Sequence, residues 1–532
     1  MRSVSIAMTV ILTLGVGIAA AQLTFDQYEL VTGVSTRQTV VTGFLLGGAM
    51  AELAVVYLDE VNDRRLCIYT FVDGAWEPTL DATLRPDVVF VDVAKIGARD
   101  RVVTYEPGRL SWFDPESATE RGLTAVTSNF RPPRGSDIPH VDITQDVNGD
   151  GHDDLVVPDV DGFWVFTQMS NGDFADPVKI GPPTEMARIY GADGYRYDPW
   201  GESRVHEMDF DRDGRDDLVF WREDHFEVHA QGERGLFAPV AETFTTDVAF
   251  DSDELSSLTT GDMVGKVLHS FADLNDDGVA DLVVFSLEGG DISSKQSTYE
   301  VHLGTPTPEG GTVFASGVDF VFQSDGIQLG MDRHDFDRDG QVDLMFTTIA
   351  VSYLESSLWK RLKGFMGDDI WLDLEFYRMD QGRYPDKPNA TRRIALDGAP
   401  SHREPGWVPL DIVLRGRTHE SRASREHWPR AFNRTLLIED ITGDGRADLL
   451  IGFDGELRVF IGVPGPDLFA RTPQTVAVTL PNDEEYTWLV DLNRDGQQDI
   501  LMHHPFTLRD AHGSPTRSSG TEPHRITMLM AR

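Results

Sequence analysis

Six acidic segments of nine residues contain the side chains of this sequence that could do chemistry. Each has Asp at positions 1, 5 and 9, Gly at position 6 and Asp, Asn or Thr at position 3, and each runs directly into a short apolar segment. We call these segments loops and name each after its first residue. The six loops are DVNGDGHDD from Asp146, DFDRDGRDD from Asp209, DLNDDGVAD from Asp273, DFDRDGQVD from Asp335, DITGDGRAD from Asp440 and DLNRDGQQD from Asp491.

The residue types and spacing of the loops are typical of a site for a hard cation such as Ca²⁺. Side-chain oxygens at positions 1, 3, 5 and 9 and a backbone carbonyl at position 7 supply the ligands, and Gly at position 6 permits a sharp turn. The sequence therefore predicts up to six Ca²⁺ ions. Because such coordination leaves little room for a substrate, we expect the metal to stabilise the fold rather than to catalyse a reaction. The predicted ligands are Asp146, Asn148, Asp150, His152, Asp154, Asp209, Asp211, Asp213, Arg215, Asp217, Asp273, Asn275, Asp277, Val279, Asp281, Asp335, Asp337, Asp339, Gln341, Asp343, Asp440, Thr442, Asp444, Arg446, Asp448, Asp491, Asn493, Asp495, Gln497 and Asp499.

Two further segments resemble the loops in spacing but lack most of the ligands. DVAKIGARD from Asp92 has Ala94 and Ile96 where carboxylates should be, and FLLGGAMAE from Phe44 keeps only Glu52 at position 9. We expect neither to hold metal. With these two included, repeats begin at residues 44, 92, 146, 209, 273, 335, 440 and 491, so most units are about 50 to 65 residues long.

Each unit contains four short apolar runs, of which one precedes the loop and three follow it. Short strands at regular spacing with one fixed motif per unit indicate the blades of a β-propeller. We predict an all-β fold with eight blades; seven is the alternative, because the degenerate first unit need not form a full blade. Only two runs follow the last loop, so the strand near LTFDQYEL should complete the last blade and close the ring.

Position 12 excludes the EF-hand as an explanation of the loops, because an EF-hand needs a carboxylate there. Apolar residues stand at that position in all six loops: Val157, Phe220, Val284, Phe346, Ile451 and Met502. With its loop-then-strand pattern, the chain resembles the FG-GAP or VCBS repeat family, the calcium-bearing propellers of integrin α subunits and of many bacterial exported proteins. The resemblance implies Ca²⁺ in loops between the first two strands of a blade. The chain departs from the family pattern in the two degenerate loops and at Thr442.

The N-terminal segment, the net charge and the cysteine content indicate the location and the class of partner that we expect for the chain. Residues 1–21 read as a secretory signal peptide, with an uncleaved anchor as the alternative, and no later segment is apolar and long enough to span a membrane. We expect one propeller domain over residues 22–532, exported to the periplasm or the extracellular space. The net charge of −41 argues against nucleic acid and anionic membranes as partners. Cys67 is the only cysteine, so bound metal is the obvious substitute for disulfides.

The interval after the Asp335 loop is longer than the others and predicts an insertion in blade six at about residues 351–434. Its first part, SYLESSLWKRLKGF, has apolar residues at helical spacing, which predicts a partly helical insertion. The part from Thr391 to Arg434 holds nine Arg and five acidic residues, with Trp407 and Trp428 among them. Such a segment could grip an anionic polysaccharide through Arg–carboxylate pairs and ring stacking, or could be a solvated loop.

These features predict an exported calcium-binding propeller that acts as a binding or adhesion module for an extracellular or envelope polysaccharide or protein. Gly-x-Ser-x-Gly and His-Glu-x-x-His motifs are absent from the sequence, and we assign no catalytic residue. The alternative is a polysaccharide lyase, because rhamnogalacturonan lyases have similar propellers. In that case Arg415 and Arg417 would neutralise a uronate and His419 would act as the base. A purely structural role in an envelope assembly also stays open.

Overall fold

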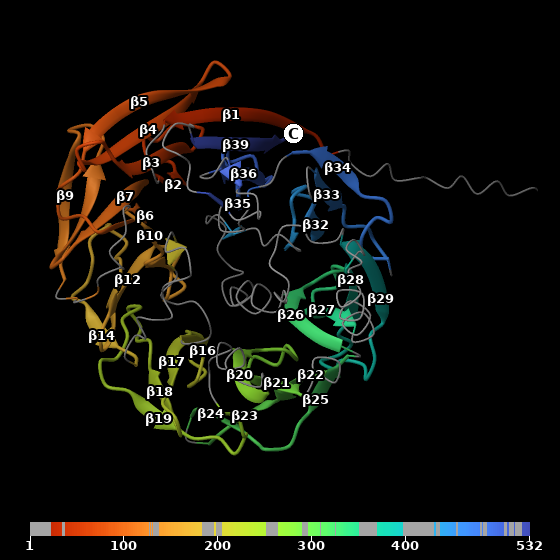
Figure 1. The fold of residues 1–532 in the computed structure, drawn as a ribbon. Helices are drawn as coiled ribbons and strands as arrows, with labels where there is room; N and C mark the ends of the chain where they lie inside the picture. Colours follow the sequence, from red (N-terminus) through yellow and green to blue (C-terminus); the bar gives the residue numbers. More distant parts are fainter. Residues whose placement is uncertain are drawn as a thin grey trace, which may run out of the picture.

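The computed structural model of the chain is a ring of β-sheets (Figure 1). The described residues form strands and contain no α-helix, and among them no helix is long and apolar enough to cross a membrane. The signal peptide predicted for residues 1–21 lies outside them. The structure describes residues 23–33, 38–126, 128, 130, 138–182, 196–197, 205–251, 264–289, 296–308, 310–324, 326–350, 370–396, 430–431, 437–453, 456–465, 467–478, 481, 487–504, 508–509, 515–516 and 524–532.

Eight antiparallel sheets follow one another around the ring, which confirms the predicted eight-bladed propeller. Within each blade the first strand lies towards the centre of the ring and the fourth lies at the rim (Figure 1). Blade one consists of β2 (Gln38–Gly43), β3 (Glu52–Leu58), β4 (Arg64–Val72) and β5 (Ala75–Thr83). Blade two consists of β6 (Phe90–Ile96), β7 (Arg99–Glu106), β8 (Arg109–Asp114) and β9 (Thr119–Ala125). Blade three consists of β11 (Thr144–Gln145), β12 (Asp154–Asp159), β13 (Gly162–Phe166) and β14 (Val178–Ile180). Blade four consists of β16 (His206–Met208), β17 (Asp217–Trp221), β18 (Phe226–His229) and β19 (Glu242–Phe244).

The remaining blades repeat this order. Blade five consists of β20 (Gly265–Ala272), β21 (Asp281–Glu288), β22 (Gln296–His302) and β25 (Phe320–Gln323). Blade six consists of β26 (Gly326–His334), β27 (Asp343–Ala350), β28 (Ile370–Tyr377) and β29 (Ala390–Leu396). Blade seven consists of β31 (Leu437–Glu439), β32 (Asp448–Phe453), β33 (Glu456–Phe460) and β34 (Gln474–Ala477). Blade eight consists of β35 (Thr487–Val490), β36 (Asp499–His504), β39 (His524–Ala531) and β1 (Phe25–Gly33).

Shorter strands lie outside this four-strand plan. Two of them, β10 and β15, extend the sheet of blade two, and β30 pairs with β35 of blade eight. Two separate hairpins pair β23 with β24 and β37 with β38. The bounds are β10 (His140–Val141), β15 (Arg196–Tyr197), β23 (Gly304–Pro306), β24 (Thr312–Phe314), β30 (Arg430–Ala431), β37 (Leu508–Arg509) and β38 (Pro515–Thr516).

The two ends of the described chain meet in blade eight. This confirms the prediction that the strand near LTFDQYEL completes the last blade. Strand β1 is the outermost strand of this blade and pairs antiparallel with β39, with Phe25 opposite Ala531. The backbone N–H of Arg532 donates to the carbonyl of Thr24 at 3.0 Å. The pairing covers an edge of β39 that would otherwise be open, so the N-terminal strand closes the ring.

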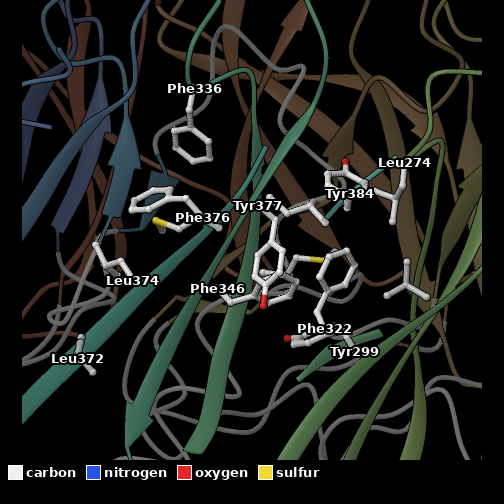
Figure 2. Packing of buried hydrophobic residues seen from close by; sticks show 14 of the residues in the cluster. Leu274, Tyr299, Phe322, Phe336, Phe346, Leu372, Leu374, Phe376, Tyr377 and Tyr384 are labelled. Carbon is white, nitrogen blue, oxygen red and sulfur yellow. The ribbon is translucent and has the colours of Figure 1, made fainter. Parts of the chain in front are cut away.

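The hydrophobic core is divided among the interfaces between adjacent blades. The second strand of a blade lies inside its sheet and faces a neighbouring blade on each side, and in β12 every residue is buried. Seven clusters of buried side chains cover the interfaces, and the largest joins blades five, six and seven. Figure 2 shows part of that cluster, where Phe322 of blade five lies 5.0 Å from Phe346 and 4.9 Å from Tyr377 of blade six, measured between ring centroids.

The insertion predicted for residues 351–434 contains two strands of the propeller itself. Strands β28 and β29 are the third and fourth strands of blade six, so residues 370–396 belong to the blade rather than to an added element. The expected helical stretch within SYLESSLWKRLKGF lies outside the described residues. Residues 397–429 also lie outside them, and they are the part of the predicted basic segment that falls between β29 and β30.

Blade two differs from the repeat frame predicted from Asp92. Strands β6 and β7 are joined by a tight hairpin, with Ile96 opposite Arg99, so the nine-residue loop is absent and Asp92 lies within β6. Its carboxylate accepts hydrogen bonds from the backbone N–H groups of Ile143 at 2.8 Å and Thr144 at 3.0 Å, and its Oδ1 lies 2.7 Å from His140 Nε2. Asp92 therefore joins blade two to the start of blade three, a long-range role that the local sequence does not reveal.

The closure by β1 gives a matched pair of variants on neighbouring residues. Leu30 is buried in the core cluster between blades eight and one, whereas Val31 is 55% exposed. We expect Leu30→Ala to lower the free energy of unfolding by about 2–4 kcal/mol, because it leaves a cavity. Val31→Ala should change it by about 0.5 kcal/mol or less. Denaturant unfolding at fixed calcium concentration measures both, and equal effects would mean that β1 does not belong to the core.

Candidate metal centres

The six predicted loops occupy equivalent places in blades three to eight. Each begins directly after the first strand of its blade and ends at the first residue of the second strand, as the pair β11 and β12 illustrates for the Asp146 loop. Because all six are connections of the same kind, they lie on one face of the ring. The fold therefore places the thirty predicted ligand residues in six separate loops, one in each of blades three to eight.

The backbone of every loop is left-handed at positions 4 and 6. The Gly residues at position 6 have φ between 79° and 88°, which explains why that position is glycine in all six loops. Position 4 has φ between 56° and 72° although Arg or Asp stands there in four loops: Arg212, Asp276, Arg338 and Arg494. Left-handed residues at positions 4 and 6 turn the chain tightly enough to direct the side chains at positions 1, 3 and 5 towards one another.

Backbone N–H groups orient the carboxylates of each loop in a repeated pattern. In the Asp209 loop, Asp209 Oδ1 accepts from the N–H of Asp213 at 2.9 Å and Asp209 Oδ2 accepts from the N–H of Gly214 at 2.9 Å. Asp213 Oδ1 accepts from the N–H of Arg215 at 3.1 Å. The same three bonds recur in the other five loops. The backbone of all six loops is thus held in one repeated conformation.

Carboxylate oxygens converge closely in two of the loops. Oxygens of Asp209, Asp211 and Asp213 lie within 4.8 Å of one another, and so do oxygens of Asp335, Asp337 and Asp343. These loops are the two with Asp at position 3. Hard oxygen donors at this spacing fit a Ca²⁺ ion, which takes six to eight oxygen ligands at about 2.3–2.6 Å.

The carboxylate at position 9 has a structural task that the sequence did not indicate. It is at most 4% exposed in all six loops. In the Asp273 loop, Asp281 Oδ2 accepts from the N–H of Leu274 at 2.9 Å, and Asp281 Oδ1 accepts from the N–H of Gly304 at 2.9 Å. Each of the other five loops has the equivalent of the second bond, which reaches the chain at the end of the third strand. The position-9 carboxylate therefore joins its loop and the start of the second strand to the end of the third strand, which lies next to it in the sheet.

Burial of these carboxyls raises their pKa values, because desolvation disfavours the charged form. Backbone N–H bonds act in the opposite direction, and the nearby carboxylates of the same loop add to the rise. The pKa of Asp154 lies well above its usual value. The pKa is raised to about 7 in Asp281 and Asp499 and to about 6 in Asp217, Asp343 and Asp448. A bound cation would offset this penalty and favour the ionised form.

Arginine side chains lie against the carboxylates of two loops. The guanidinium of Arg378, one residue beyond β28, forms ion pairs with Asp337 and with Asp339, the latter at 3.3 Å. Arg215, predicted as a ligand through its carbonyl, pairs with Asp213 through its side chain. The contact of Arg378 with the Asp335 loop depends on the course of the chain after the third strand, so the sequence near Arg378 contains no signal for it.

Two glutamines connect the loop face from blade to blade. Gln231 Nε2 of blade four donates to the carbonyl of Asn148 at 2.9 Å in the loop of blade three. Gln168 Nε2 of blade three donates to the carbonyl of Lys95 at 2.9 Å in blade two. Both residues begin a short turn of the form Gln-x-x-x-Gly-x-Phe, found at 168–174 and 231–237. This second repeated signal follows the third strand and could have marked the inter-blade contacts in the sequence.

The residues considered for a lyase, Arg415, Arg417 and His419, lie outside the described residues. Two arginines of the predicted basic segment lie in β29. Arg392 donates to the carbonyls of Phe469 at 2.9 Å and Ala470 at 2.6 Å in blade seven, and Arg393 pairs with Asp373 at 2.7 Å. Arg392 therefore joins blade six to blade seven, and Arg393 joins two strands within blade six.

No protein-family model matches the chain, and no curated protein matches it. Among solved structures, the chain is similar to the WD40 domain of SCAP from fission yeast, with 8% identity, 95% of this chain and 98% of that chain covered, and a TM-score of 0.33. It is similar to the V. cholerae biofilm matrix protein Bap1, with 11% identity, 84% and 89% covered, and a TM-score of 0.28. It is also similar to the Photorhabdus luminescens Tc holotoxin pore, with 12% identity and a TM-score of 0.28, where 90% of this chain spans only 17% of that chain. At such TM-scores these likenesses carry no argument about family or function.

The different tasks of positions 5 and 9 can be separated with two variants of the Asp273 loop. Asp281→Asn should lower the free energy of unfolding by about 1–3 kcal/mol even in chelator, because the amide nitrogen cannot accept a backbone N–H bond. Asp277→Asn, at an exposed position, should change it by about 0.5 kcal/mol or less in chelator. Denaturant unfolding with chelator gives both values. If Asp281→Asn were neutral there, the structural role of position 9 would be refuted.

Proposed function

We propose that this chain is an exported, calcium-binding β-propeller of the FG-GAP or VCBS type that acts as a binding or adhesion module. The observation that carries the proposal is the repetition of one oxygen-rich loop, with the same backbone hydrogen bonds, at the same place in six of eight blades. Repetition of a strained turn in this way is unexpected unless the carboxylates it gathers are used.

Calcium is the cation that best suits these loops. Their donors are carboxylate, amide and hydroxyl oxygens with a backbone carbonyl, and no sulfur or imidazole is needed to complete a site. Without a cation, carboxylates that converge within 4.8 Å repel one another, as in the Asp209 and Asp335 loops. The sites should differ in strength, because Arg378 already pairs with two carboxylates of the Asp335 loop and Thr442 replaces a stronger ligand in the Asp440 loop.

We place the partner contact of the module in residues 397–429. This stretch connects β29 to β30 and contains five of the nine arginines counted in the sequence between 391 and 434, together with all five acidic residues and both tryptophans. An anionic polysaccharide is the partner that its arginines and tryptophans fit best, through Arg–carboxylate pairs and ring stacking. An extracellular protein with an acidic surface is the other candidate.

Calcium should stabilise the mature chain from Gln22. In about 10 mM calcium, which is about ten to a hundred times the dissociation constants typical of extracellular loops, the melting temperature should rise clearly over its value in chelator. A site at a hundredfold excess of calcium adds about 2.7 kcal/mol to the free energy of unfolding. Magnesium at the same concentration is the control for ionic strength, and a variant with Asp213→Asn and Asp339→Asn should show a smaller rise. No rise, together with no calcium in metal analysis of the purified protein, would refute the proposal.

Replacement of residues 398–428 by a Gly/Ser linker should abolish binding to anionic polysaccharide without loss of calcium-dependent stability. The replacement leaves β28 and β29 in place, which deletion of the whole of 351–434 would not do. A screen of immobilised uronate and sulfated polysaccharides measures binding, and a neutral glucan is the control. If the variant binds as the parent does, the partner contact lies elsewhere on the propeller.

A further inference from the structure

The Asp440 loop lacks a hydrogen bond that the other five loops have. In those loops the side-chain Oδ1 at position 3 accepts from the N–H at position 5, at distances of 2.9 to 3.2 Å. Thr442 occupies position 3 of the Asp440 loop, and its hydroxyl donates instead to Asp440 Oδ1 at 3.3 Å. The loop therefore has less internal support for Asp444 and a weaker predicted ligand at position 3.

A side chain from the neighbouring blade contacts the Asp440 loop at this weakened place. Arg338, at position 4 of the Asp335 loop, donates from Nε to the carbonyl of Gly445 at 3.0 Å and from Nη2 to the carbonyl of Asp444. The contact is close, because a Cβ added at Gly445 would overlap the guanidinium. Arg338 is exposed and its φ is 65°, so the course of its own loop determines where its side chain can reach.

The two carbonyls that Arg338 binds belong to the peptides that orient the predicted ligands. The peptide between Asp444 and Gly445 donates its N–H to Asp440 Oδ2 at 2.5 Å. The peptide between Gly445 and Arg446 donates its N–H to Asp444 Oδ1 at 2.9 Å. Arg338 thus binds the carbonyl oxygens of two peptide groups. The N–H groups of the same two peptides donate to the carboxylates at positions 1 and 5.

We infer that Arg338 is a positioning residue for the cation site of the neighbouring Asp440 loop, and that calcium binding in the Asp335 and Asp440 loops is positively coupled through it. The inference rests on the proposed calcium binding. A cation in the Asp335 loop would restrict the backbone at Arg338. The two hydrogen bonds of Arg338 would then restrict the peptides that follow Asp444 and Gly445 in the Asp440 loop. By linkage, calcium in the Asp440 loop favours binding in the Asp335 loop to the same extent. Solvent screening at this exposed place weakens the repulsion between the guanidinium and the bound cation.

The chain contains a matched control for Arg338. Arg212 stands at the same position of the Asp209 loop and has a φ of 60°. Among the described residues it makes no hydrogen bond or ion pair that reaches the next blade. Arg212→Ala and Arg338→Ala therefore remove the same charge from the same strained backbone position, and only the second removes a contact between loops.

The test is calcium binding to the full mature chain, measured by equilibrium dialysis and isothermal titration calorimetry. We expect Arg338→Ala to lower the overall calcium affinity of the Asp335 and Asp440 loops by about tenfold, because the coupling between them is reciprocal. The melting temperature of Arg338→Ala in chelator should stay close to that of Arg212→Ala. Arg212→Ala should bind calcium as the parent does. Thr442→Asp, added to Arg338→Ala, should restore the lost affinity, because it supplies the missing acceptor and ligand at position 3.

Each outcome of the test bears on the inference. Equal titrations for Arg338→Ala and Arg212→Ala would overturn it, and so would failure of Thr442→Asp to restore binding. If the parent binds calcium in either of those cases, the proposed function stands and only the coupling fails. A parent that binds no calcium overturns both. Should Arg338→Ala not fold, Arg338→Lys carries the same test, because lysine keeps the charge but cannot donate to both carbonyls in this geometry.

Discussion

In blades three to eight, the hydrogen bonds of one buried carboxylate determine how loop, second strand and third strand fit together. In each of the six acidic loops the position-9 carboxylate begins the second strand and accepts an N–H from the end of the third, as Asp281 does from Gly304. In blade one, Glu52 stands at the same position and is buried, and it accepts from the N–H of Leu46 at 3.0 Å in the connection that precedes β3. A buried carboxylate at the start of the second strand therefore also holds the preceding connection in a blade where no cation is expected.

The fold could be predicted from the sequence because its strongest signals are local. The loop fixes where the second strand begins, and the apolar run after it, as in Asp217–Trp221, is short enough to be a buried strand. The closing strand β1 was predictable for a different reason. The last unit has only three strands of its own, and one predicted strand at the start of the sequence belongs to no other unit. Both features follow from counting within a repeat, so they need no knowledge of distant contacts.

The parts of the fold that were predicted wrongly depend on contacts between blades or on strands without a motif. Asp92 resembles the first residue of a loop, yet its carboxylate accepts hydrogen bonds from the N–H groups of Ile143 and Thr144 at the start of the next blade. The turn that follows β6 is a tight hairpin. Strands β28 and β29 follow a long interval without a nearby loop, so they were read as an insertion. Arg338 and Arg378 were missed because neither their position nor their type shows that they reach a neighbouring segment.

The closure of the ring also has a consequence for the order in which the molecule forms. Blades one to seven are each made from a continuous stretch of chain and can pair their strands as soon as that stretch is free. Blade eight must wait, because Phe25 pairs with Ala531 and the partners are the first and last parts of the described chain. Closing so long a loop adds only modest entropy, since the penalty grows slowly with length, but contacts so distant in sequence form late. The seam between β1 and β39 is thus the last part of the ring to assemble and the natural place for it to begin to open.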